Sequence, residues 1–382
     1  MKFATPHTPS ASSSGSSSAS PIASSSPSAA PSSTPAGVPA GATAGRPFLS
    51  YAGGQAHAVR IDGASLQVEG GPADPPSHWT LSGHGGDLAL GPATEGGRPA
   101  PATHLLAALD GAFAAHPERR DIAMQHVDPQ ALAALAEAGV VLPAADGNWR
   151  ACRDTLWQQP GLWRPVVPPP MAQRFALTEG RYHPRRAPKP HGLLYQRYIP
   201  WLGRTFTFRS LDIDGDLPRF NRWMNDPDVA VIWEEEGDLQ KHRAYLEGIA
   251  RDPHMHSMIA SLDGEPFAYF EAYWTKESRI APFYDAHDYD RGWHVLVGEP
   301  AFRGKAFATA WLTSISHYLF LCDARTQRIL GEPRIDHHQQ IRNLDKSGYA
   351  KVKEFDLPHK RAQLVMLLRE HYFYDGLWLP RT

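Results

Sequence analysis

Residues 293–312 combine an apolar segment, small residues and basic residues in the order that an anion-binding site requires. The apolar first part predicts a buried strand, and the last part predicts a helix. Unpaired backbone N–H groups and the helix dipole favour an anion at a helix N-terminus. Arg303 and Lys305 add positive charge, and Gly304 lets the backbone approach a phosphate closely. The spacing predicts a pyrophosphate site, although a Gly-Lys pair before a helix is common in proteins generally.

The elements that position this segment alternate between strand-like and helix-like patterns from about Leu193 to Arg369. The Asp263-Gly264 pair between two of the strands is typical of a hairpin turn. Hairpins mixed with strand–helix–strand crossovers predict an α+β fold arranged as an α/β sandwich. The predicted strands are 206–209, 258–262, 267–273, 292–298, 328–331, 351–355 and 363–368, and the predicted helices are 217–224, 240–251, 306–321 and 338–346.

A smaller α+β region is predicted for residues 46–163. Two alternating segments flank Asp62-Gly63 and predict a β-hairpin. Residues 104–115 and 129–138 are rich in Ala and Leu and predict helices, the second with Asp128 as N-cap and Pro129 at the first helical position. One interpretation is a degenerate second half-domain that completes the sheet, and the sequence alone leaves its role open.

Two further segments have compositions that do not predict a packed domain. Residues 1–45 are almost entirely Ser, Ala, Pro, Gly and Thr, which predicts a disordered tail. Residues 164–190 are rich in Pro and Arg, which predicts a linker or an arm wrapped on a domain. The predicted organisation is therefore a tail at 1–45, an α+β region at 46–163, a linker at 164–190 and a C-terminal domain at 191–382.

The composition narrows the class of function. The formal net charge of -2 lacks the basic excess that is typical of nucleic-acid binders. Cys152 and Cys322 form no disulfide framework and no metal-binding pair, which favours two thiols in a reducing compartment. The first residues lack the apolar part of a secretory signal, and no stretch approaches the ~20 apolar residues that span a bilayer. We expect a cytoplasmic protein that has no nucleic-acid or membrane partner.

Several motifs resemble one enzyme superfamily. The segment 303–308, Arg-Gly-Lys-Ala-Phe-Ala, resembles the Arg/Gln-x-x-Gly-x-Gly/Ala pyrophosphate loop of GNAT acyltransferases, with Ala306 where that family usually has Gly. The segment 344–349 resembles the end of the family's last helix. Segments 270–274, 284–292, 325–328, 331–334 and 355–362 resemble the siderophore-biosynthesis acyltransferases of this superfamily, over roughly residues 190–373.

The resemblance implies a GNAT fold for residues 191–382 and a specific reaction. An acyl group passes from acyl-CoA, with acetyl-CoA the favoured donor, to the hydroxylamine nitrogen of hydroxylysine, hydroxyornithine or a hydroxylated diamine. The product is a hydroxamate for siderophore biosynthesis and iron acquisition. Because no Cys or Ser nucleophile motif lies near the loop, we expect direct attack in a ternary complex.

The resemblance also implies which residues hold the donor. The backbone of Leu296 and Val297 is expected at the thioester carbonyl and the pantetheine arm, because this strand splays from its neighbour in the GNAT fold. Their side chains are expected in the core. The residues expected to bind the rest of the cofactor are Arg303, Gly304, Lys305, Ala306, Phe307 and Ala308.

Two residues are predicted to take part in the chemical step. His294, on the strand before the loop, is the predicted general base, and its alternative is a structural histidine hydrogen-bonded in the sheet. Asp336 lies where related enzymes have an active-site Asp, and it is predicted to orient the substrate N–OH or to accept its proton. The alternative for Asp336 is the N-cap of the helix that begins near His338. His337 replaces the Asn that usually follows this Asp.

A neighbouring strand offers a predicted acceptor pocket, formed by Glu271, Tyr273 and Trp274, or else these residues are core. The His and Asp residues at 287–290 and 336–338 suggest a metal site on paper. Acyl transfer from a thioester needs no metal, so we expect none. The alternative function is a non-catalytic acyl-CoA-binding or scaffold protein that partners a siderophore synthetase.

Overall fold

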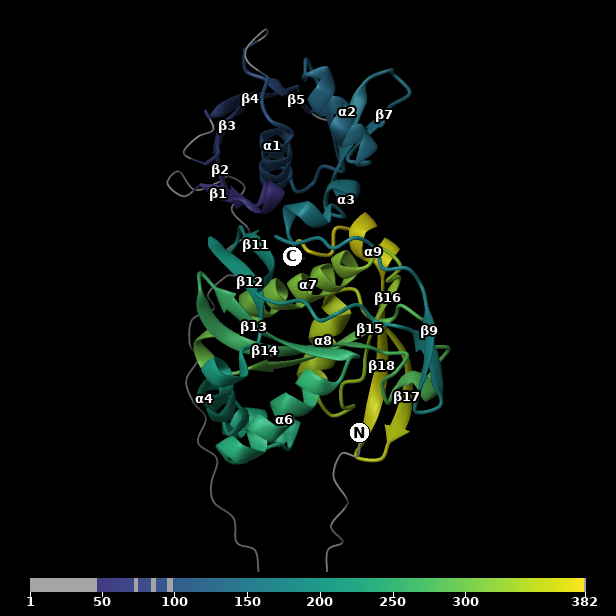
Figure 1. Ribbon diagram of the computed structural model, residues 1–382. Helices are drawn as coiled ribbons and strands as arrows, with labels where there is room; N and C mark the ends of the chain where they lie inside the picture. The colour runs from purple at the N-terminus through teal and green to yellow at the C-terminus, as the bar shows by residue number, and fades with distance from the viewer. Residues whose placement is uncertain (1–46, 72–74, 84–86, 95–98, 381–382) are drawn as a thin grey trace, which may run out of the picture. The chain divides into compact units, whose positions relative to one another are not determined.

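The computed structural model describes residues 47–71, 75–83, 87–94 and 99–380 (Figure 1). Contacts divide the chain into two compact units, residues 1–37 and 38–382. The first unit, and with it the predicted tail at 1–45, lies outside the described residues. Every element described below belongs to the second unit.

The N-terminal region forms a mixed eight-stranded sheet. Its strands are β1 (Phe48–Ser50), β2 (His57–Asp62), β3 (Ser65–Glu69), β4 (Ser77–Ser82), β5 (Ala89–Pro92), β6 (Asp121–Met124), β7 (Val141–Pro143) and β8 (Trp149–Cys152), and its helices are α1 (Ala102–Ala115), α2 (Pro129–Glu137) and α3 (Arg153–Leu156). The strand order is β1-β2-β3-β4-β5-β6-β8-β7. Strands β5 and β6 are parallel and are joined through α1, and the other neighbours are antiparallel.

The C-terminal region forms a second mixed eight-stranded sheet. Its strands are β11 (Leu193–Ile199), β12 (Arg204–Ser210), β13 (Met255–Leu262), β14 (Glu265–Trp274), β15 (Arg291–Val297), β16 (Arg328–Gly331), β17 (Ala350–Leu357) and β18 (Lys360–Leu368), and its helices are α4 (Ile213–Met224), α5 (Pro227–Trp233), α6 (Leu239–Arg251), α7 (Lys305–Cys322), α8 (His338–Lys346) and α9 (Arg369–Tyr374). The strand order is β11-β12-β13-β14-β15-β16-β18-β17. Only β15 and β16 are parallel, and α7 connects them.

Alternation along the strands assigns different helices to the two faces of this sheet. Ile259, Tyr269 and Leu296 pack in one cluster with residues of α4 and α6. The intervening residues, such as Phe270 and Trp293, pack in another cluster with α7. Figure 1 shows α4 and α6 on one side of β13 and β14 and α7 on the other. Because side chains two residues apart share a face, His294 lies on the α4–α6 face with Leu296.

The sequence predicted most of these elements. The predicted hairpin is β2–β3, with Asp62 opposite Ser65, and Asp128 caps α2 by accepting hydrogen bonds from two backbone N–H groups. Each segment predicted between residues 206 and 368 falls on an observed strand or helix of the same type, and the α+β sandwich is confirmed. Strand β11 was missed because its buried residues follow one another from Leu194 to Arg197, without alternation.

The segment predicted as a linker or arm contains a two-stranded sheet, β9 (Phe175–Thr178) and β10 (Arg181–Pro184). Arg186 forms a buried, bidentate ion pair with Glu277, through Nε at 2.6 Å and Nη2 at 2.8 Å. Lys189 donates to the Ile249 and Ala250 carbonyls at the end of α6. This segment is therefore bound to the C-terminal region through its basic residues.

The N-terminal and C-terminal regions share part of one apolar core. Trp157 stacks on Trp378, with ring centroids 4.1 Å apart, and its carbonyl accepts a hydrogen bond from His317 Nε2 at 2.7 Å. Arg164 donates to the Leu321 carbonyl at 2.9 Å. The N-terminal sheet is therefore packed onto the C-terminal one through the end of α7 and the chain after α9.

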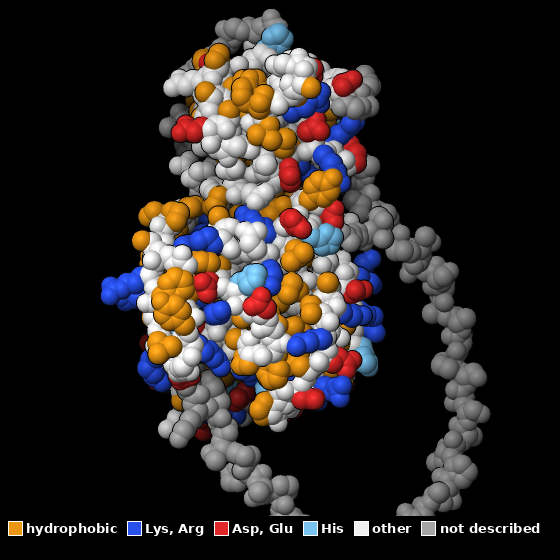
Figure 2. All heavy atoms as spheres, turned by 90° about the vertical axis from the view of Figure 1, so that its right-hand side faces the viewer, with side chains coloured by type: hydrophobic (Ala, Val, Ile, Leu, Met, Phe, Trp, Pro, Cys, Tyr) orange, Lys and Arg blue, Asp and Glu red, His pale blue; other side chains and the backbone are white. Residues whose placement is uncertain are grey.

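The surface matches the balanced charge of the sequence. Acidic and basic side chains are interspersed over the face in Figure 2, with apolar side chains between them. Within the described part of the chain, no helix is both long enough and apolar enough to cross a membrane.

Candidate active site

His294 lies between two buried carboxylates. The antiparallel register of β14 and β15 places Glu271 directly opposite His294, so their side chains meet on one face. His294 Nδ1 lies 2.8 Å from Glu271 Oε2, and Nε2 lies 3.2 Å from Glu332 Oε1. Both carboxylate side chains are 3% exposed, whereas the imidazole is 27% exposed. In this row of three side chains, Glu271–His294–Glu332, the histidine is therefore more accessible to solvent or a ligand than the two acids are.

Three donors hold the carboxylate of Glu271: His294 Nδ1, as described above, and two tyrosine hydroxyls. Tyr245 on α6 donates to Oε1 at 2.5 Å, and Tyr269 donates to the same oxygen at 2.9 Å. A buried carboxylate is stable as an anion only when its oxygens are hydrogen-bonded or paired. Glu271 is thus fixed by α6 and β14 before any ligand binds, and it fixes the orientation of His294.

Glu332 follows β16 and is held from a different side. Tyr273 donates to Oε2 at 2.9 Å, and Arg279 Nη2 lies 3.4 Å from Oε1. Lys360 donates to the Glu332 backbone carbonyl at 2.6 Å. Gly292 makes room for this arrangement, because a Cβ atom there would lie 2.3 Å from Tyr273 Cζ.

The carboxylates change the proton affinity of the histidine. Burial opposes the charged imidazolium, but hydrogen bonds and charges from Glu271 and Glu332 outweigh it and raise the pKa of His294. Burial likewise opposes the carboxylates, but the hydrogen bond and charge of His294 lower the pKa of both acids. The site therefore favours imidazolium between two carboxylates, and a base must be generated from it by loss of one proton.

Strand β15 is open on one edge beyond His294. It pairs with β16 only at Arg291–Ile329 and Gly292–Leu330. Among the described residues, no strand pairs with the β16-facing edge from Trp293 onward. Backbone groups on that edge can therefore bind a ligand, with the exception of the Val297 carbonyl, which accepts from Arg303.

The loop at residues 303–308 begins α7. Gly304 is the N-cap residue, at a φ of +119°, a conformation that favours glycine. Nothing lies within 4 Å of where its Cβ would be, so the backbone is open on that side. Arg303 bonds Asp228 at 2.6 Å and the Val297 carbonyl at 3.2 Å, which ties the loop to α5 and to β15. Gly304, Lys305 and Ala306 are exposed.

The structure brings some of the predicted site residues together and separates others. Glu271 and Tyr273 lie around His294, whereas Trp274 points to the opposite face of β14 and stacks against Arg291 and Arg186. Asp336 is exposed and forms a bidentate ion pair with Arg334.

The predicted alternative for Asp336, an N-cap, is wrong. His337 occupies the N-cap position of α8, and the carboxylate of Asp336 binds Arg334 instead. Burial and the charge of Arg334 lower the pKa of His337, and the charge of Asp336 opposes this.

Sequence reasoning missed three residues of the site. Glu332 lies in the segment 331–334, which was used only for the family resemblance, and Tyr245 lies in the predicted helix 240–251, which was given no site residue. Trp233, the last residue of α5, lies edge-on to His294, with ring centroids 6.3 Å apart. The signal available for Glu332 was a carboxylate directly after a buried strand, next to the strand of His294.

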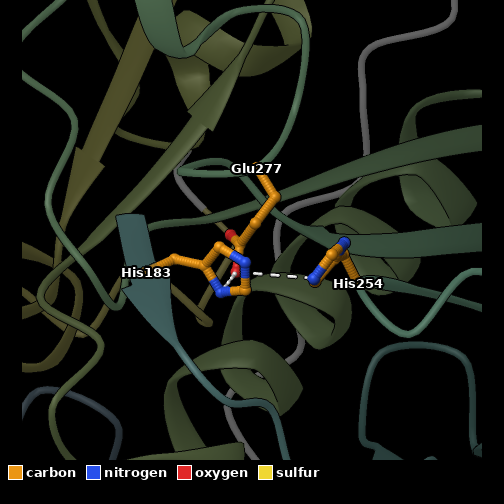
Figure 3. Close-up of side chains that lie close together, drawn as sticks. All are labelled: His183, His254 and Glu277. Atoms are coloured by element: carbon orange, nitrogen blue, oxygen red, sulfur yellow. Dashed lines mark ion pairs between the residues drawn. The ribbon is translucent and has the colours of Figure 1, made fainter. Parts of the chain in front are cut away.

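A second cluster of side chains, separate from the site around His294, has the residue types of a metal site. His183, His254 and Glu277 place one potential ligand atom each within 4.8 Å of the others (Figure 3). His183 Nδ1 lies 2.9 Å from both Glu277 Oε1 and the Pro184 carbonyl, so this nitrogen carries a proton and has no lone pair for a metal. Arg186 already neutralises Glu277. The cluster therefore anchors the β9–β10 segment.

The fold and site define an acyltransferase of the GNAT class. A family model described as an acetyltransferase (GNAT) domain matches residues 212–357. The chain is 41% identical to N(6)-hydroxylysine O-acetyltransferase of Escherichia coli, over 58% of this chain and 71% of that protein. It is 39% identical to a putative lysine N-acyltransferase of Schizosaccharomyces pombe, over 67% of this chain and 76% of that one.

Two further matches each cover half of this chain. An N(5)-hydroxyornithine:cis-anhydromevalonyl coenzyme A transacylase of Beauveria bassiana is 45% identical over 50% of this chain and 43% of its own length. A crystal structure of an uncharacterised Bacillus halodurans protein aligns at a TM-score of 0.47 and 25% identity, over 50% of this chain and 96% of that one. The chain belongs to the siderophore-biosynthesis N-acyltransferases of the GNAT superfamily.

Proposed function

We propose that this protein transfers an acyl group from acyl-CoA to the hydroxylamine nitrogen of an N-hydroxylated amino acid or diamine. The product is a hydroxamate for siderophore biosynthesis. The observation that carries the proposal is the buried row Glu271–His294–Glu332 beside the open edge of β15 and the N-terminus of α7. The names of the relatives support the same reaction type.

The donor would lie along β15 and the loop. Exposed N–H groups at the start of α7 suit the pyrophosphate, and Gly304 leaves them accessible. The open edge of β15 suits the pantetheine amides and the thioester carbonyl. The residues proposed to hold the donor are those predicted above: Leu296, Val297, Arg303, Gly304, Lys305, Ala306, Phe307 and Ala308. Acetyl-CoA is the proposed acyl donor.

The chemical step follows from the position of His294. The hydroxylamine nitrogen attacks the thioester carbonyl, the carbon–sulfur bond breaks, and CoA leaves as the thiol. The nitrogen's proton passes to His294 Nε2, while Nδ1–H remains hydrogen-bonded to Glu271. The imidazolium then gives this proton to the departing thiolate sulfur, which yields CoA as the thiol and regenerates the neutral imidazole. Asp336 is the second candidate acceptor of a proton. The hydrogen bond and charge of Arg334 lower the pKa of Asp336, which makes it a weaker base than His294.

The acceptor pocket is proposed around the exposed side of His294, with Tyr273 and Trp233 as walls. We also propose a cytoplasmic location. Cys152 and Cys322 are free thiols, each partly exposed, which suits a reducing compartment. A siderophore synthetase that consumes the hydroxamate is the proposed partner.

The test measures CoA release and hydroxamate formation with acetyl-CoA and three acceptors: N6-hydroxylysine, N5-hydroxyornithine and N-hydroxyputrescine. Lysine is the matched control, because it lacks only the hydroxyl group. The proposal requires turnover with at least one hydroxylamine and much less with lysine. Tight CoA binding without turnover on any acceptor would favour the scaffold alternative.

A further inference from the structure

Cationic side chains gather at Glu332, next to the proposed catalytic histidine. Arg279 approaches Glu332 Oε1, and Lys360 donates to the Glu332 backbone carbonyl. Burial lowers the pKa of Lys360 most, Glu332 opposes this, and the charges of Arg279 and Arg334 lower it further. Several positive charges therefore share one carboxylate.

Arg279 and Lys360 keep hydrogen-bond donors to spare. In the described part of the structure, the Arg279 guanidinium has one contact, with Glu332 at 3.4 Å, and its side chain is 51% exposed. Arg328 differs, because it binds Asp290 through two nitrogens and also binds a backbone carbonyl. Arginine has five N–H donors and lysine three, so both cations near Glu332 can bind a further anion.

The spare donors of Arg279 lie close to the imidazole of His294. A single oxygen, Glu332 Oε1, contacts both His294 Nε2 at 3.2 Å and Arg279 Nη2 at 3.4 Å. The guanidinium is therefore one carboxylate away from the imidazole. An acceptor whose hydroxylamine lies at His294 would place a group a few methylenes away beside Arg279.

Opposite charge is available close by. Glu234 ends α5 at a φ of +55°, its side chain is 64% exposed, and it pairs with Arg334 at 2.9 Å. Burial lowers the pKa of His359 most, the charges of Arg279 and Lys360 lower it further, and the charges of Glu234 and Glu332 oppose this. This mixture of charges suits a zwitterion, whereas a diamine carries positive charge alone and would leave the spare donors of Arg279 and Lys360 without an acceptor.

We propose that the acceptor is an N-hydroxylated amino acid rather than a hydroxylated diamine, and that Arg279 and Lys360 bind its α-carboxylate. This inference rests on the proposed function, and it selects among the acceptors that the proposed function leaves open. Arg279 and Lys360 are specificity-determining residues in this scheme, and Glu234 faces the α-ammonium group.

The first test uses the wild-type protein and acceptors that differ only by the carboxylate. N6-hydroxylysine is compared with N-hydroxycadaverine, and N5-hydroxyornithine with N-hydroxyputrescine. We expect kcat/KM to favour the amino acid of at least one pair by roughly 10- to 100-fold, the range for a charge-assisted hydrogen bond. Equal kcat/KM within both pairs would overturn the inference and leave the proposed function intact. No turnover with any of the four would overturn both.

The second test assigns the preference to residues. Arg279→Gln should lower the kcat/KM preference for the amino acid over the matching hydroxylated diamine by roughly 10-fold or more, because any loss that acts through Glu332 falls equally on both acceptors. Lys360→Met should act in the same direction, and Arg279→Lys should recover part of the loss. Arg361→Gln is the matched control, because the Arg361 side chain pairs with Glu354 and Asp356 at the surface. An equal loss with both acceptors in Arg279→Gln would show that Arg279 acts only through Glu332, and would overturn its assignment.

Discussion

The N-terminal and C-terminal sheets have the same topology, but only one carries the candidate site. Strands β1 to β8 are ordered as β11 to β18 are, with the last two strands exchanged in both sheets. In each sheet one parallel pair, β5–β6 or β15–β16, is joined through a helix and extends over only two residue pairs. A short helix, α3 or α9, directly follows the corresponding strand. The N-terminal region is therefore a second copy of the same architecture. The interpretation of this region as a half-domain that completes the C-terminal sheet is wrong, because β1 to β8 form a full sheet of their own.

The parallel pairs align the two sheets residue by residue. When the pair Ala89–Ala123 is placed on Arg291–Ile329, each residue of the row Glu271–His294–Glu332 has a counterpart in the N-terminal region. The corresponding positions are Pro92 for His294, Trp79 for Glu271 and His126 for Glu332. Neither Pro92 nor Trp79 can accept a proton at these positions, so the same backbone lacks the same chemistry.

The second difference is the connection between the second and third strands. Gly63 and Ala64 join β2 to β3, whereas residues 211–254, with α4, α5 and α6, join β12 to β13. Those helices supply Tyr245, which holds Glu271, and Trp233, which faces His294. The comparison shows that strand order alone does not make this site, and that the site depends on inserted helices and on three side chains.

The largest effect is expected from replacing His294, the proton acceptor that the N-terminal sheet lacks. His294→Ala should lower kcat by roughly 10²- to 10⁴-fold, the usual contribution of a positioned proton acceptor. The KM for acyl-CoA should change little, because the proposed donor contacts are made by backbone and by Arg303. Pro92→Ala, at the corresponding position, should leave kcat unchanged. A folded His294→Ala protein with wild-type kcat would exclude His294 as the base and leave Asp336 as the candidate.

The next prediction tests whether the two copies are one folding unit. Trp157 packs against Trp378 and Trp163 in the shared core. Trp157→Ala should lower the free energy of unfolding by about 3–5 kcal/mol. Because the core is shared, calorimetry should show one transition that moves as a whole. Two separate transitions, with the C-terminal one unmoved, would show that the copies fold independently.

A smaller effect is expected in the anion-binding loop. Gly304→Val forces a β-branched residue to a φ of +119°, which costs about 1–3 kcal/mol and turns the exposed N–H groups away from the phosphates. CoA affinity should fall roughly 10-fold, as measured by calorimetry. Gly264→Val is the matched control, since Gly264 has a φ of +80°, is also open on its Cβ side, and lies in the β13–β14 turn. Equal CoA affinity in the two variants would count against the loop assignment.

The sequence predicted the C-terminal fold, and the position of His294 on the strand before the loop, because the signals for both are local. Alternation, turn pairs and the Gly-Lys segment are all contained within a few residues. Glu332 and Tyr245 could not be found in this way, because their meeting with His294 depends on the pairing of β14, β15 and β16 and on the docking of α6. Trp274 was grouped with Tyr273 by proximity in the sequence, whereas adjacent residues of a strand point to opposite faces.

The smallest expected effect is a shift in pH dependence, and it tests the role of the carboxylates that the N-terminal copy lacks. The pKa of His294 is raised, so the proposed base is protonated at pH values above the ordinary value of about 6.5, and kcat should fall as the pH drops through the raised pKa. Glu332→Gln removes one of the two negative charges that raise this pKa, so the acid limb of the profile should move to lower pH. Glu265→Gln, an exposed carboxylate in the same sheet, is the control for net charge and should leave the limb in place. Stability should change in the opposite sense, because a raised histidine pKa stabilises the folded protein below about pH 6.5 and this stabilisation is lost as the pH rises through the raised value. An acid limb that stays in place in Glu332→Gln would show that Glu332 does not act on the proton of His294.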